Sequence, residues 1–322
     1  MIKKAVSLSI FLLISKGLVA NADDSSLSTV DSFEKLFGVT EGKRRNHTKG
    51  FCFDAVLVPD VAVMQQYSNS SLFSGESAVI GRLSHKGGNH MAADDKAAEY
   101  GMGLSFALPS GETHLMSMNT LDFFPVATPE AFAQLMRAKA QGSAAVKAFK
   151  QKSTDLQRFK AHGATKSKRL VPYEGSTYNS LNSFYLVNAD GVKTAVRWSF
   201  EPVVQQAVVM EPKQDFFFDN MQKNLADHEV TWNMVVTLAN DGDVIDNAAL
   251  PWKGKHKKLL AAKLKVMSIS SEQQGQCEKI NYDPLVLSQG FAPSADPLLQ
   301  ARRNSYAISF GRRVGEKQAS KN

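Results

Sequence analysis

The sequence predicts an α+β fold, in which a closed antiparallel β-barrel of eight strands carries helical insertions and is followed by a C-terminal helix. About eight segments have the length and side-chain pattern of strands, helical segments separate some of them, and nothing repeats at a fixed period. Eight strands suit a closed barrel, which leaves no exposed sheet edge. Hydrophobic residues make up 43% of the 322 residues and charged residues 21%, so a large core is expected and disorder is not.

The N-terminus has the form of a cleavable secretory signal peptide, residues 1–22. A basic start precedes a short apolar run from Val6 to Leu13, and Ala20-Asn21-Ala22 has the small-x-small form of a cleavage site. The run is too short to cross a bilayer, and no later segment approaches the ~20 apolar residues of a membrane span. We therefore expect a periplasmic protein without stable membrane insertion, with one mature domain of residues 23–322.

The charge balance gives no reason to expect a nucleic-acid partner. The net charge is +7, and removal of Lys3, Lys4 and Lys16 with the signal peptide would leave +4. Positive and negative residues are mixed along the rest of the chain, without a long basic run.

Four strands are expected in the first half of the mature chain. They follow a polar leader, Asp23–Val30, and a short helix, Asp31–Phe37. Apolar or alternating side chains mark the strands as Phe51–Val58, Ser77–Ser84, Gly103–Leu108 and His114–Asn119. The loop Lys86–Lys96 holds a histidine and two aspartates, but their spacing sets no coordination geometry, so we expect no metal there.

Helices and four more strands are expected in the second half. Thr128–Phe159 is rich in alanine and lysine and predicts a helix, with an interruption at Gly142-Ser143, and Val171–Ser183 is irregular. A hairpin with Asp190-Gly191 at its turn comes next. The hairpin and the elements after it are Phe184–Phe200, a helix at Phe216–Ala226, and strands at Thr231–Leu238 and Lys263–Ser270.

The C-terminal helix presents a tyrosine between arginines. Asp296 suits the N-cap, and Pro297 suits the first helical position. At about 100° per residue, Arg302, Tyr306 and Arg313 fall on one face. A cation one turn away lowers the pKa of a tyrosine, and a phenolate is a good ligand for Fe(III), including the iron of haem. The alternative is a basic helix whose tyrosine packs in the core.

His47 and the two cysteines also stand out. His47 lies just before the first strand, three residues after Arg44, where an exposed side chain is the simpler interpretation. Cys52 and Cys277 form no CxxC pattern, and two buried free thiols are one interpretation. Cys52 lies in the first strand and Cys277 follows the last one, and a closed barrel would bring these two strands together. In an exported chain we therefore expect a disulfide between the two cysteines.

Four segments together resemble the haem catalase superfamily, and most of all its small members, the catalase-related peroxidases. The family motifs are Arg-x-x-His-x-Lys-Gly, Arg-Phe-Ser, Asn-Thr-x-x-Phe-Phe, and a proximal helix with Arg-x-x-x-Tyr-x6-Arg. Their counterparts occur in the same order and at similar separations between Leu36 and Gly315. They are Arg44–Gly50, Arg82-Leu83-Ser84, Asn119-Thr120 with Phe123-Phe124, and the stretch from Tyr282 to Arg313.

The resemblance implies haem b, with its iron, as the cofactor. Tyr306 would be the proximal iron ligand, kept ionised by Arg302. His47 would be the distal base, with its ring fixed by Ser84, and Asn119 the distal hydrogen-bond donor. The other cofactor contacts would be three arginines at the haem propionates and two phenylalanines near the haem plane or access channel: Arg44, Arg82, Arg313, Phe124 and Phe132.

The implied activity is that of a peroxidase. It would reduce hydrogen peroxide or organic hydroperoxides through a ferryl state, and a small organic donor would return the electrons. The chain lacks the N-terminal arm, wrapping segment and C-terminal domain of full catalases, and Ala307-Ile308-Ser309 replaces their Asp-Thr after the tyrosine. We therefore expect weak or no catalase activity, and a monomer or dimer.

Two alternative functions use the same fold. A haem carrier would need only the proximal side, so the presence of both His47 and Asn119 argues against it. A haem enzyme that rearranges a fatty-acid hydroperoxide remains the other alternative.

Overall fold

The computed structural model describes residues 24–96 and 98–320, so the expected signal peptide lies outside the described residues. Ten strands form one antiparallel sheet. They are β1 Gly50–Pro59, β2 Ser77–His85, β3 Tyr100–Ala107, β4 Thr113–Asn119, β5 Tyr178–Asn179, β6 Phe184–Val187, β7 Lys193–Pro202, β8 Thr231–Leu238, β9 Lys258–Ser270 and β10 Phe291–Pro293.

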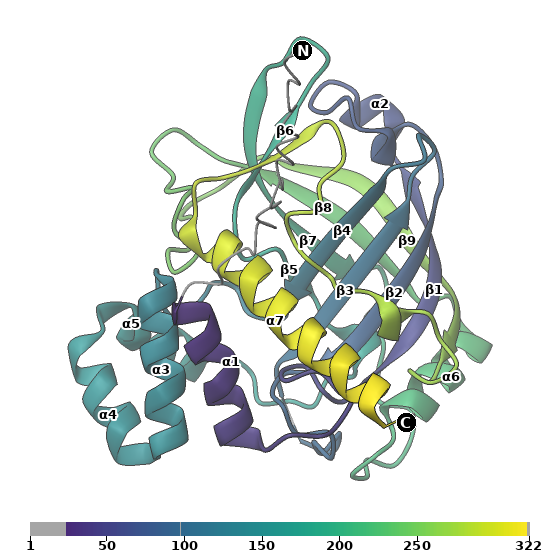
Figure 1. Cartoon of the computed structure of the whole chain (residues 1–322). Coiled ribbons are helices and arrows are strands. Elements are labelled where there is room, and N and C mark those ends of the chain that lie inside the picture. The colour runs from purple at the N-terminus through teal and green to yellow at the C-terminus, as the bar shows by residue number, and fades with distance from the viewer. Residues whose placement is uncertain (1–23, 97, 321–322) are drawn as a thin grey trace, which may run out of the picture.

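Eight of these strands close into a barrel (Figure 1). The ring runs β7-β5-β4-β3-β2-β1-β9-β8, and β8 pairs back with β7. Strands β6 and β10 continue the sheet outside the ring, because β6 pairs with one end of β7 and β10 pairs only with β6. The predicted eight-stranded antiparallel barrel is therefore confirmed.

The barrel differs from the prediction in one of its eight strands. The predicted hairpin strand at Phe184 is β6, which lies outside the ring, and its place is taken by β5. Strand β5 has two residues within a stretch that we expected to be irregular, and it pairs with β4 through Asn179 alone. Two residues are too few to show an alternating pattern. Strand β9 also begins at Lys258, five residues before the predicted start at Lys263, because the preceding run of lysines hides its first residues.

Seven helices accompany the barrel in the described part of the chain. They are α1 Asp24–Phe37, α2 Val61–Met64, α3 Pro129–Gln141, α4 Ser143–Lys152, α5 Thr154–Thr165, α6 Phe217–Asp227 and α7 Pro297–Ala319, with short 3-10 turns at Ser71–Phe73, Tyr173–Gly175 and Cys277–Lys279.

Two helix boundaries differ from the prediction. The expected polar leader is the first half of α1, because Ser26, Thr29 and Val30 are buried where α1 packs on α3 and α7. Small hydroxyl side chains hide this packing face from a hydropathy pattern. The long helix breaks at Gly142, as predicted, and again at Ser153, whose hydroxyl caps α5 by accepting a hydrogen bond from the Leu156 amide at 3.1 Å.

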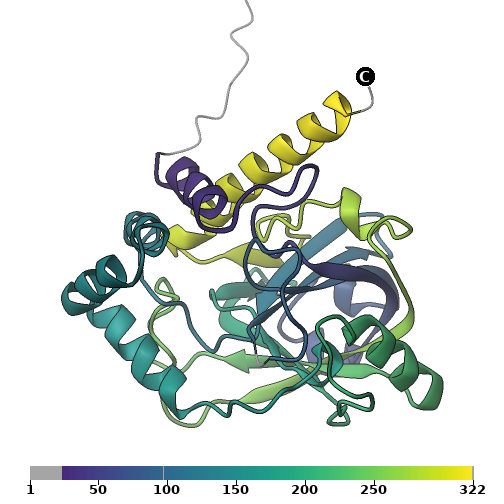
Figure 2. The same ribbon diagram turned by 90° about the horizontal axis from the view of Figure 1, so that it is seen from below.

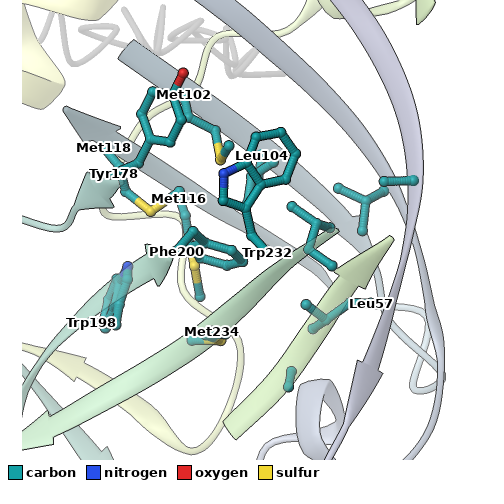
Figure 3. Packing of buried hydrophobic residues seen from close by; sticks show 14 of the residues in the cluster. Leu57, Met102, Leu104, Met116, Met118, Tyr178, Trp198, Phe200, Trp232 and Met234 are labelled. Atoms are coloured by element: carbon teal, nitrogen blue, oxygen red, sulfur yellow. The ribbon is translucent and has the colours of Figure 1, made fainter. Parts of the chain in front are cut away.

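Large side chains fill the inside of the barrel (Figure 3). Trp232, Phe200 and Tyr178 are fully buried there, and the indole of Trp232 donates to the carbonyl of Ser176 at 3.0 Å. The barrel is therefore a packed core, which leaves its outer wall as the place for a ligand.

The site-forming helices lie against that outer wall. Helix α7 crosses the face of β2, β3 and β4, and α1 runs beside α7 in both views (Figures 1 and 2). Helix α3 packs on the other side of α1. Among the described residues, no helix is both long and apolar enough to cross a membrane.

The expected disulfide is present. Cys52 in β1 is bonded to Cys277, with the two Cα atoms 5.4 Å apart and a sequence separation of 225. It ties the first strand to the segment that leads from β9 towards α7.

Candidate active site

Two connected cavities lie between the barrel wall and the helices. The first, of about 770 Å³, is lined by Gly101–Gly103 of β3, by β4 and by α7. The second, of about 1110 Å³, extends beneath α1 and α3. Both are lined by His47 and Tyr306, so they meet between these two side chains.

His47 is held in a strained backbone conformation at one wall. Its φ of 56° lies in the left-handed region, which a residue with a Cβ rarely adopts outside sites that require it. The carboxamide oxygen of Asn46 stabilises this turn by accepting hydrogen bonds from the amides of His47 and Gly87, at 3.0 and 2.8 Å. The expected bond to Ser84 is also present, with 3.1 Å between its hydroxyl and His47 Nδ1.

The surroundings of His47 keep its ring neutral. Burial lowers its pKa to about 3, and the positive charges of Arg82, Lys86 and Arg302 act in the same direction. A neutral imidazole has one ring nitrogen that can accept a proton, and its lowered pKa favours passing that proton on to another group.

Tyr306 faces the same space from α7. Its phenol oxygen lies 2.9 Å from the hydroxyl of Ser117 in β4 and 3.4 Å from Nη2 of Arg302, one turn earlier on the helix. Burial opposes ionisation of the phenol, but the charge of Arg302 and the hydrogen bonds from Ser117 and Arg302 outweigh it. The pKa of Tyr306 is therefore below that of an ordinary tyrosine.

Arg302 is itself fixed by a chain of hydrogen bonds. Its guanidinium donates to Asn182 Oδ1 at 2.6 Å and to the Ser117 carbonyl at 2.7 Å. Asn182 in turn donates to Asp296 at 2.9 Å, and Asp296 also caps α7 by accepting from the Leu298 amide. One aspartate therefore both starts the helix and anchors the arginine that acts on Tyr306.

Sequence reasoning missed two members of this group. Asn182 lies in a stretch with no regular pattern, so nothing in the sequence connects it with α7. Ser117 precedes Asn119 by two residues on one strand, and the two-residue period of a strand could have placed both on the same face.

The three predicted arginines converge at the far end of the first cavity. Arg82 donates to Glu272 at 2.6 Å and Arg313 donates to Glu278 at 3.0 Å, while Arg44 lies within 3.4 Å of Glu272 and 3.7 Å of Glu278. The same two carboxylates also bind two lysines, Lys43 and Lys317.

This cluster has more positive than negative charge. Burial together with the charges of Arg82 and Arg313 lowers the pKa of Arg44 to about 9, although both carboxylates oppose the change. The pKa of Glu272 is held at about 2 by Arg82, Lys43 and Arg44 in spite of its burial. Five cations share two carboxylates, so the cluster can accept further anionic groups.

The remaining predicted residues line the second cavity. Asn119 lies at the end of β4, and its side-chain amide has no hydrogen bond to the part of the chain that is described. The rings of Phe124 and Phe132 pack together with their centroids 4.9 Å apart. All ten predicted site residues thus line these cavities.

Comparison with known proteins identifies the family. No protein-family model matches the chain. It is 33% identical over 300 residues to a catalase-related peroxidase of Synechococcus elongatus, covering 88% of this chain and 87% of the relative. A catalase-related peroxidase of Mycolicibacterium paratuberculosis is 22% identical over 294 residues, with 89% and 94% covered. The chain belongs to the catalase-related peroxidases.

Solved catalases share the fold of this catalase-related peroxidase. A fungal catalase superimposes with a TM-score of 0.72 at 17% identity, and a bacterial catalase with 0.67 at 16%. These matches cover 85% and 84% of the chain but only 59% and 57% of the catalases, so the chain spans less than three-fifths of their length. Membership of the family makes the chain an oxidoreductase, and it implies a haem.

The residues of the cavity fit a haem. A lowered pKa makes Tyr306 easier to ionise to the phenolate that Fe(III) prefers, and the excess positive charge at Arg44, Arg82 and Arg313 suits two carboxylates. Tyr306 and the arginine cluster both line the first cavity.

Proposed function

We propose that the protein is a haem b peroxidase that reduces hydrogen peroxide or organic hydroperoxides with electrons from a small donor. The observation that carries this proposal is the pair formed by His47 and Tyr306. A neutral imidazole and a phenol with a lowered pKa line one cavity, and the relatives are named as peroxidases.

The protein would hold the haem by two kinds of contact. Tyr306 would ligate the iron, while Arg302, fixed by Asn182, favours ionisation of the phenol. The arginine cluster would bind the propionates. The bound haem would supply the redox chemistry by storing the oxidising equivalents of the peroxide until a donor returns two electrons.

His47 would move the proton. A peroxide enters with a proton on one oxygen, and the O–O bond breaks more readily when that proton moves to the other oxygen, which then leaves as water or an alcohol. His47 would accept the first proton and pass it to the leaving oxygen, with its ring held by Ser84. The amide of Asn119 would donate a hydrogen bond that orients the peroxide.

Several finer features stay part of this proposal. They are the oxidised haem state expected from the sequence, weak or absent catalase activity, and a monomeric or dimeric protein. The second cavity supports access for molecules larger than hydrogen peroxide, because it extends from His47 to the helices at the surface.

The test follows both fates of peroxide in one preparation of haem-loaded protein. Hydrogen peroxide is added with a chromogenic donor, and donor oxidation is recorded with oxygen release. We expect donor oxidation to consume most of the peroxide. Oxygen release as the main product would show a catalase, and no consumption at all would contradict the proposal.

Export to the periplasm is a separate proposal, supported by the sequence of residues 1–22 alone. N-terminal sequencing of the protein from the periplasm should begin at Asp23. A protein that keeps Met1 and stays in the cytoplasm would contradict it.

A further inference from the structure

One short segment, residues 271–280, contacts all three arginines of the cluster at the far end of the first cavity. It leads away from β9 and carries both carboxylates of the cluster. Glu272 accepts a hydrogen bond from Arg82 at 2.6 Å, and Glu278 accepts one from Arg313 at 3.0 Å. The place of this segment therefore decides where these two guanidinium groups lie.

Arg44 depends on the backbone of the same segment. Its Nη2 donates to the carbonyls of Cys277 and Ile280, at 3.0 and 3.1 Å. The side chain of Arg44 is only 14% exposed, and it shares the cluster with the positive charges of Arg82 and Arg313. Fixed acceptors offset this repulsion and the loss of hydration. Arg44 therefore keeps its position only while the segment keeps its own.

The disulfide joins this segment covalently to the barrel. In the described part of the chain, residues 271–280 make their backbone-to-backbone hydrogen bonds with one another. Cys277 is bonded to Cys52 of β1, which lies directly opposite Arg82 on β2. Gly275 packs closely against the bond, since a Cβ there would lie 2.5 Å from Cys52 Sγ. The bond thus holds the segment beside the strand position of one arginine of the cluster.

Both sulfur atoms are protected once the chain has folded. Cys52 is 2% exposed and Cys277 is 0% exposed. Thiol–disulfide exchange requires a thiolate to reach a sulfur atom, so burial prevents reduction in the folded protein. The conditions under which the chain folds therefore decide whether the segment is fixed.

We propose that the Cys52–Cys277 disulfide positions the arginines that would bind the haem propionates, so that the oxidised protein holds haem more tightly than the reduced protein. The inference rests on the proposed function, because it concerns the same haem. Without the bond, haem binding has to order the segment together with its arginines, and this ordering reduces the affinity. Firm retention of haem then requires that the chain folds under oxidising conditions.

The test measures how fast haem-loaded protein loses its haem to an excess of apomyoglobin. The parent is compared with the double variant Cys52→Ala/Cys277→Ala, each loaded with haem or with haem dimethyl ester, whose propionates carry no charge. Ordering three long side chains changes an affinity by about tenfold or more, mostly through the dissociation rate. The double variant should therefore lose haem about tenfold faster than the parent. Both proteins should lose the ester at similar rates, because the ester makes no ion pair with the arginines.

Leu264→Ala is the matched control for stability. Leu264 of β9 is fully buried in the packed interior of the barrel, so its truncation also destabilises the fold. This variant should lose haem at the parental rate. Parent protein refolded with dithiothreitol should behave like the double variant, and it takes the place of that variant if the substitutions prevent folding.

Four results would overturn the inference. The parent and the double variant could lose haem at equal rates, or the double variant could lose haem and ester equally faster. Leu264→Ala could accelerate haem loss as much as removal of the bond. Failure of both the double variant and the reduced parent to fold would show that the bond supports the whole barrel. A parent that binds no haem would instead contradict the proposed function.

Discussion

His47 owes its position to contacts that are spread over the sequence. Its φ of 56° is held by Asn46, the residue before it, and its ring is held by Ser84, 37 residues away. The motifs predicted both His47 and Ser84, because the family pattern fixes their identities and order. The backbone strain could not be predicted, since no glycine marks it.

Replacement of His47 tests its role in proton transfer separately from haem binding. His47→Ala should keep haem content and the ferric spectrum, because the proposed role of His47 involves no bond to iron. The first reaction with peroxide, measured by stopped flow, should slow by a factor on the order of 10²–10⁴. Later reduction by a donor should change much less. A variant that reacts with peroxide at the parental rate would remove His47 from the mechanism.

Lys139 lines the second cavity, and its lowered pKa predicts that the free energy of unfolding depends on pH even without a ligand. Its folded pKa of about 8 lies below the ordinary lysine value, so between the two the unfolded chain binds more protons. The free energy of unfolding should therefore rise with pH through this window by about 1–2 kcal/mol more in the parent than in Lys139→Met. Urea titrations at pH 7.5 and 10 measure the difference. Parallel curves for both proteins would show that the ammonium is solvated.

At the scale of elements, helix ends with a capping residue were predicted well. Asp296 and Pro297 begin α7 where the sequence places them. The start of α1 was wrong, because serine and threonine on its buried face do not form an apolar stripe. Strand β5 could not be found, since its two residues depend on neighbours far away in sequence.

The disulfide joins two elements that are far apart in the sequence. Cross-linking restricts the unfolded chain, and a loop of 225 residues is long enough for a large effect. Cys52→Ala with Cys277→Ala should lower the free energy of unfolding by about 2–4 kcal/mol in urea titrations. Reduction of the parent should have the same effect. Two alkylatable thiols in the unreduced protein would contradict the bond.

At the scale of the whole molecule, the barrel provides a rigid wall and the helices complete the site. The packed interior keeps ligands outside the ring, and α7 and α1 cover the outer wall (Figure 2). Arg45 connects these helices by binding Glu34 of α1 at 2.7 Å and Glu316 of α7. The motifs predicted the fold and the candidate site residues. The positions of Asn182 and Lys139 in the site could not be predicted, because they depend on segments that are distant in the sequence.

The central claim is that Tyr306 binds the iron of a haem between α7 and the barrel. The most direct test compares the absorption spectra of the haem-loaded parent, Tyr306→Phe and Tyr282→Phe. Tyr282 lines the same cavity, but burial raises its pKa above that of an ordinary tyrosine, so it serves as the matched control. The parent and Tyr282→Phe should show a high-spin ferric tyrosinate haem, and Tyr306→Phe should lose stoichiometric haem or change the spectrum. A Tyr306→Phe variant with the parental Soret band and activity would contradict the assignment.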